Sequence, residues 1–182
     1  MDTASRTDAR PTARRALPLL TAAALLVSGA AAHAQSLITA KPLAEETCAD
    51  LAKTASKETG VPVDTVVGDA EPFMYTNVDG TACLFSGTAT GLDKSPAGLA
   101  RLADGFEGWT RVASNDADGP GATSLTLRRD DDWFGLSVAA EPPAGSCDGV
   151  MVSECKAPMK EWTWTVTGMA FSAPAGSGTP TL

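Results

Sequence analysis

Histidine is almost absent from this chain. His33 is the only one among 182 residues, and it lies in the triplet Ala32-His33-Ala34, which is typical of a signal-peptide cleavage site. We expect cleavage after Ala34 to remove it. Because histidine is the commonest general base and metal ligand, the remaining chain excludes a Ser/His or Cys/His nucleophile relay and a histidine-ligated zinc site.

Several other motifs with a defined chemistry are missing. The sequence contains no G-x-x-x-x-G-K-[ST] loop and no G-x-G-x-x-G turn, so we assign no nucleotide or nicotinamide cofactor. It has no Cys-x-x-Cys pair, which disfavours a four-cysteine zinc site. The N-terminal apolar stretch is shorter than the roughly 20 residues that a bilayer-spanning helix needs.

The N-terminal segment has the order of features found in a secretory signal. Four arginines precede an apolar stretch at residues 16–27, and small residues then lead to the cleavage triplet. We predict a signal peptide at 1–34, a single domain at 35–171 and a disordered tail at 172–182. A single membrane anchor is the alternative for the first segment. We expect the protein in the periplasm or outside the cell, with no membrane span after cleavage.

The chain is acidic, with 14 Lys and Arg against 22 Asp and Glu. Residues 1–34 hold four arginines and two aspartates, so their removal leaves 10 against 20 and changes the net charge from −8 to −10. Phosphate backbones and anionic lipid headgroups repel such a protein when it has no basic stripe. We therefore expect no nucleic-acid partner; a basic protein or an envelope component is the expected partner.

Four cysteines lie in the exported part of the chain, and an even number in an oxidising compartment predicts two disulfides. Three pairings are possible. The short segment between Cys147 and Cys155 contains Gly and lies in a Pro- and Gly-containing region, which favours a local bond there and leaves Cys48 to pair with Cys83.

Apolar spacing predicts two helices and several strands. One helix runs from Pro42 to Glu58 with Gly60 beyond its end, and a shorter one runs from Ser95 to Gly105. Strands are predicted at residues 63–67, 73–77, 82–88, 109–113, 124–129, 133–140 and 162–168.

The order of these elements predicts an α+β fold. We expect a single domain with a mostly antiparallel, curved sheet, two helices packed on one side of it, and two disulfides. Asp79-Gly80 is predicted to form the turn of a hairpin between the second and third strands. In the last strand, Trp162, Trp164 and Val166 share one face while threonines line the other.

Three tryptophans form the candidate ligand surface. Trp133, Trp162 and Trp164 fall in strands that we expect to be neighbours, where exposed indoles would stack a sugar or a peptide. The alternative, which is favoured for large aromatic side chains, is that they fill the core beneath the helices.

Three fragments match parts of known motifs. Ser153-Glu-Cys-Lys156 fits the Ser-x-x-Lys of serine acyltransferases, but the Ser-Asp-Asn and Lys-Thr-Gly elements are missing. Asp116-Ala-Asp118-Gly119 begins like a calcium loop but has Leu125 in place of the twelfth-position Glu, which indicates a simple Asp/Gly turn. The acidic run at 130–132 is predicted to be a solvated turn.

The missing catalytic residues favour a non-enzymatic exported domain that binds a protein, a peptide or a cell-envelope component. A specific version is an antagonist that inserts carboxylates into the basic active site of a hostile hydrolase. Two alternatives stay open. One is an envelope hydrolase that works through a carboxylate pair, and the other is a purely structural or stress-related envelope protein.

Overall fold

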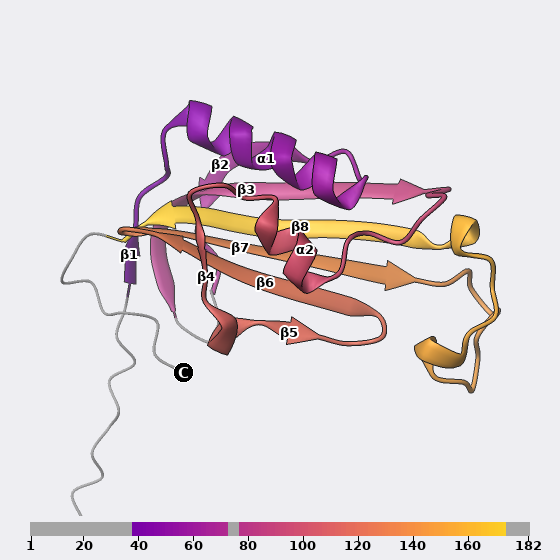
Figure 1. The fold of residues 1–182 in the computed structure, drawn as a ribbon. Helices are drawn as coiled ribbons and strands as arrows, with labels where there is room; N and C mark the ends of the chain where they lie inside the picture. Colours follow the sequence, from indigo (N-terminus) through magenta and orange to yellow (C-terminus); the bar gives the residue numbers. More distant parts are fainter. Residues whose placement is uncertain (1–37, 73–76, 174–182) are drawn as a thin grey trace, which may run out of the picture. The chain divides into compact units, whose positions relative to one another are not determined.

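The computed structural model describes residues 38–72 and 77–173, which form a curled, mostly stranded sheet with two helices (Figure 1). The strands are β1 (Ile38–Ala40), β2 (Asp64–Asp69), β3 (Val78–Thr90), β4 (Thr110–Arg111), β5 (Ala117–Asp118), β6 (Ala122–Arg129), β7 (Asp132–Glu141) and β8 (Thr163–Ser172). The helices are α1 (Glu45–Thr59) and α2 (Leu99–Asp104). Three single 3₁₀ turns lie at Ala113–Asn115, Val152–Glu154 and Met159–Glu161.

The sheet has the strand order β1-β3-β8-β7-β6-β4, with β2 also on β3 and β5 also on β6. Every pair is antiparallel except β1 with β3, which is parallel. The prediction of a mostly antiparallel sheet is therefore confirmed. A two-residue turn at Asp130 and Asp131 joins β6 to β7, and Asp130 adopts a positive φ of 54° there, which short hairpin turns require.

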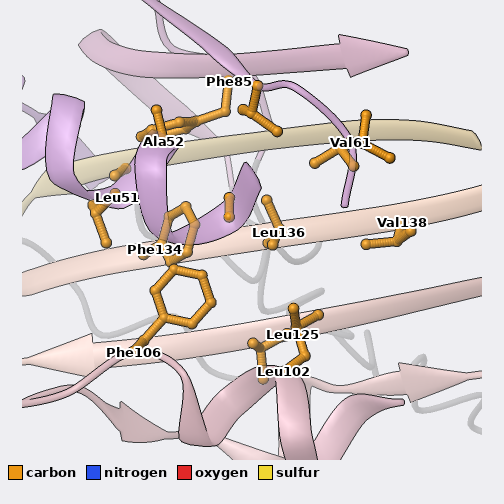
Figure 2. Close-up of a cluster of buried hydrophobic side chains, with 14 of the residues drawn as sticks. Leu51, Ala52, Val61, Phe85, Leu102, Phe106, Leu125, Phe134, Leu136 and Val138 are labelled. Carbon is orange, nitrogen blue, oxygen red and sulfur yellow. The ribbon is translucent and has the colours of Figure 1, made fainter. Parts of the chain in front are cut away.

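Both helices pack on one face of the sheet, which we call the covered face. Helix α1 carries acidic residues in its first turn, and its C-cap Gly60 has a φ of 74°, as is typical of a helix end. Its buried residues recur at helical spacing and meet Leu102 of α2 and the strand residues Phe134 and Leu136 in one cluster. Figure 2 shows the rings of Phe106 and Phe134 facing each other in this core; their centroids are 5.1 Å apart.

A second, smaller apolar cluster involves the short strand β1. It contains eight buried residues: Ile38, Ala40, Val78, Ala82, Trp133, Met169, Phe171 and Ala173. The strand members of this cluster alternate with those of the first, as Trp133 does with Phe134, so they belong to the opposite face of the sheet. One end of that face is thus buried, although no described helix covers it.

The structure corrects one predicted turn. Asp79-Gly80 does not form a hairpin, because it lies inside β3 where that strand pairs with β1. Gly80 has a φ of 109°, and a Cβ there would overlap the carbonyl oxygen of Ala40. The glycine is therefore required by a close approach of two backbones rather than by a turn. Most of the strand predicted at 73–77 lies outside the described residues.

Three further boundaries differ from the predictions. Helix α1 begins at Glu45 rather than Pro42, and α2 is only six residues long. Strand β8 continues to Ser172, and the N–H of Ala173 donates a hydrogen bond to the carbonyl oxygen of Asp131. Ser172 and Ala173, which were predicted to begin the tail, thus belong to the described fold.

Two disulfides form with the favoured pairing, Cys48–Cys83 and Cys147–Cys155. The first joins α1 to β3 inside the covered core, where both cysteines are fully buried. The second closes a surface loop between β7 and β8, and its two cysteines are eight positions apart in sequence. Two disulfides fit an exported protein, because such bonds persist in oxidising compartments.

Candidate functional site

A hollow of about 350 Å³ opens at one end of the covered face. Four segments far apart in sequence contribute to it, and we call it the tryptophan hollow. Its lining comprises residues 95–98 before α2, residues 119–123 around the start of β6, Val138 and Ala140 of β7, Val152, Ser153 and Cys155 of the cystine loop, and Ala157, Met159, Trp162 and Trp164.

Trp162 and Trp164 lie side by side in this hollow. Their rings are stacked, with centroids 6.5 Å apart and an interplanar angle of 26°. The indole N–H of Trp162 donates to the carbonyl oxygen of Ala157 at 3.0 Å. The indole nitrogen of Trp164 is buried and has no hydrogen-bond partner among the described residues.

The rim of the hollow and the adjoining cystine loop expose apolar side chains. Of the five large hydrophobic residues that are exposed in the described part of the chain, three belong to this region: Val150, Met151 and Met159. The Cys147–Cys155 bond holds the loop that supplies Val152 and Ser153 to the lining. Clustered apolar exposure of this kind is typical of interaction sites, and methionines adapt to ligands of varied shape.

The polarity of the hollow follows from its lining residues. None of its lining residues, among those that the structure describes, carries a charge. It therefore does not contain the two carboxylates that a hydrolase of the alternative class would need. The polar groups of its lining residues are the hydroxyls of Ser95, Thr123 and Ser153, the indole N–H groups of the two tryptophans, and backbone atoms.

The structure separates the three predicted ligand tryptophans. Trp162 and Trp164 come together as described, but Trp133 packs in the cluster on the opposite face, with Arg128 5.0 Å above its ring. All three are less than a tenth exposed, so they form no exposed aromatic platform. The fourth tryptophan, Trp109, is half-buried at the covered core, and the guanidinium of Arg129 lies 4.6 Å from its ring centroid.

The face of the sheet that the helices leave uncovered carries a second hollow, of about 470 Å³. Ser86, Thr167, Ser137 and Ser124 form a row of hydroxyls in register across four neighbouring strands. Ser124 and Ser137 hydrogen-bond to each other at 2.7 Å. Leu84, Met169 and Val66 of β2 give the other part of this hollow an apolar lining. The sequence showed the threonine face of β8 but not the row across the sheet.

The aspartates of the calcium-loop fragment are used within the fold. One carboxylate oxygen of Asp116 accepts the backbone N–H of Thr126 at 2.8 Å, and the other pairs with Arg111. Asp118 accepts the hydroxyl hydrogen of Thr123 at 2.7 Å. These contacts agree with the simple turn that the sequence indicated. Among the described residues, no three His, Cys, Asp or Glu side chains gather as a metal ligand set would.

Comparison with family models, curated proteins and solved structures finds no match to this chain. None of the helices in residues 38–72 and 77–173 has the length and hydropathy needed to cross a membrane. Indications of function therefore come from the geometry of the tryptophan hollow and of the sheet.

Proposed function

We propose that this protein is a small, acidic, exported domain that binds without catalysis. Its tryptophan hollow takes an uncharged, largely apolar segment of a protein, peptide or cell-envelope component. One observation carries the proposal: Trp164, whose indole nitrogen is buried without an acceptor, lines a hollow whose described lining has no charge. Periplasmic or secreted location is part of the same proposal.

The chemistry of indole supports this choice of ligand. An indole N–H can only donate a hydrogen bond, and leaving such a donor buried and unpaired costs about 1–3 kcal/mol. A ligand carbonyl oxygen would recover this cost by accepting from Trp164, once the ring turns its buried N–H toward the hollow. The apolar residues beside the carbonyl would pack against Met159 and Ala157, which also line the hollow.

The net charge has a different role in this proposal. A charge of −10 after loss of the leader steers a basic partner toward the domain and raises the association rate at low salt. A basic hydrolase, antagonised by this domain, is one such partner. The hollow itself gives specificity for an uncharged segment, because any charge placed there would lose its water without a counter-ion.

The test is an NMR titration of the mature protein labelled at its tryptophan indole nitrogens. The four tryptophans give separate indole signals. The signal that is missing in the Trp164→Phe variant is that of Trp164. We expect acetylated and amidated, uncharged decapeptides with a central Leu or Pro to move the Trp164 signal and leave that of Trp133 in place.

A pair of variants controls for general effects of added charge. Met159→Glu puts a carboxylate in the hollow and is expected to abolish the shift, whereas Val66→Glu replaces another exposed apolar residue, on β2, and is expected to preserve it. If no peptide of the series moves the Trp164 signal at millimolar concentration, the proposed function is wrong and a scaffolding role takes its place.

A further inference from the structure

Strand β2 has an exposed apolar edge. Val66 and Val67 are 64% and 60% exposed, which places them among the most exposed large hydrophobic residues that the structure describes. Within the described chain β2 pairs only with β3, so its outer edge retains unpaired backbone N–H and carbonyl groups. Such an edge is a template for a further strand, and proteins normally shorten, cover or charge it.

The register of β2 puts its two valines on opposite faces of the sheet. Val66 is opposite Leu84, whose face carries the uncovered hollow, and Val67 is opposite Cys83, which lies in the covered core. An added strand would therefore find an apolar neighbour on each face at consecutive positions. The uncovered hollow, which Val66 borders, continues the apolar surface on one side.

Aspartates stand at both ends of this edge. Asp64 and Asp69 are the first and last residues of β2, and both are exposed. In the antiparallel pairing of two copies that places valine against valine, Asp64 of each copy would lie opposite Asp69 of the other. Like charges that face each other across a strand pair are destabilising. The edge is thus unsuited to a second copy and is complementary to a strand with basic ends.

We propose that the β2 edge binds an extended segment of a partner protein, which adds to the sheet as a further strand. The segment has the pattern basic-x-apolar-apolar-x-basic. Its two central residues pair with the valines, and its Lys or Arg residues pair with Asp69 and Asp64. Because these aspartates are five positions apart, the two basic side chains lie on opposite faces of the added strand. Main-chain hydrogen bonds give the affinity and the charges give the selectivity.

The first test titrates the mature protein with the peptide acetyl-Lys-Thr-Val-Val-Thr-Lys-amide. We expect its addition to shift the backbone amide signals of β2 and β3, and the matched peptide with Glu at both ends to bind at least about tenfold more weakly. The Asp64→Lys/Asp69→Lys variant is expected to reverse this preference. Equal binding of both peptides by both proteins would overturn the charge pattern, and absence of any β2 shift would overturn strand addition.

The second test makes the edge complementary to itself. The single variant Asp69→Lys places a lysine opposite Asp64 of a second copy at both ends of the same antiparallel pairing. We expect this variant to form a concentration-dependent dimer in sedimentation experiments, while the wild type and the doubly substituted variant stay monomeric. Asp131→Lys makes the same charge change in an exposed turn and is expected to stay monomeric.

The two tests are independent of the tryptophan hollow. A monomeric Asp69→Lys protein would contradict an edge that is competent for pairing, whatever the Trp164 indole signal does. Conversely, dimerisation of that variant supports the edge even if no uncharged peptide enters the hollow. The substituted side chains are exposed and do not belong to the covered core, so each variant is expected to fold. Far-UV circular dichroism checks this.

Discussion

Removing the two disulfides one at a time is expected to destabilise the fold by clearly different amounts. The perturbations are Cys48→Ala/Cys83→Ala and Cys147→Ala/Cys155→Ala. The closed loops have sequence separations of 35 and 8. Loop-closure entropy then gives a loss of about 4 kcal/mol for the first pair and about 2.5 kcal/mol for the second. For a domain of this size, these losses correspond to roughly 14 °C and 9 °C in melting temperature.

Burial should widen this difference. Cys48 and Cys83 lie in the covered core, so alanine leaves unfilled volume there, whereas Cys147 and Cys155 are only half-buried in a surface loop. The assay is urea unfolding of both variants and the wild type under non-oxidising and oxidising conditions, followed by tryptophan emission. Equal losses of stability from the Cys147–Cys155 bond and the buried bond would contradict this ranking. Before urea is added, loss of the surface bond should also change the tryptophan emission of the folded protein, because that loop adjoins Trp162.

Two further pairs of substitutions test single contacts, and all four variants are read from urea unfolding midpoints. Gly80→Ala is expected to lower the free energy of unfolding by about 3 kcal/mol, because Gly80 has a positive φ and the backbone carbonyl of Ala40 lies beside it. Gly60→Ala, at a positive φ with open space around it, is expected to lower it by only about 1 kcal/mol. Equal losses would contradict the close approach of the two backbones. Asp116→Ala leaves a buried backbone N–H of β6 without its acceptor and should cost about 2 kcal/mol. The exposed contact of Asp118 makes Asp118→Ala cost less than about 0.5 kcal/mol, and the reverse order would refute the assigned roles.

The sequence predicted the long elements because each has a clear apolar period. Helix α1 and strands β6 to β8 follow from the spacing of a few buried residues, such as Leu51 with Ala55 and Leu125 with Leu127. The pairing of the cysteines follows from the short Gly-containing segment between the last two. Strand β1 was missed because three residues carry no period. Asp79-Gly80 was misread because a Gly at positive φ serves a turn or a close backbone contact equally well, and only the position of β1 decides between them.

The candidate site was harder to predict than the fold. Its two tryptophans were identified from their alternation in β8, but the hollow also needs residues 95–98, 119–123 and 152–159, which no local pattern links. These segments meet because β3, β6, β7 and β8 are neighbours in the sheet and each has one end beside the hollow. The β2 edge could not be predicted for the same reason. Val66 and Val67 have the pattern of ordinary core residues, and only the strand order shows that their strand lies at an edge.

The position of Trp133 shows what the alternation of apolar residues along a strand can predict and what it cannot. Phe134, Leu136 and Val138 alternate along β7 and all enter the covered core, so Trp133, one position earlier, must point to the other face. The sequence therefore already argued against a ligand surface shared with Trp162 and Trp164. What alternation could not supply is the burial of Trp133 on that second face, since this depends on β1 and Phe171 packing there. An indole on the uncovered face becomes core once Ile38 and Ala40 of β1 join its cluster, and this burial removes Trp133 from the set of ligand-binding residues.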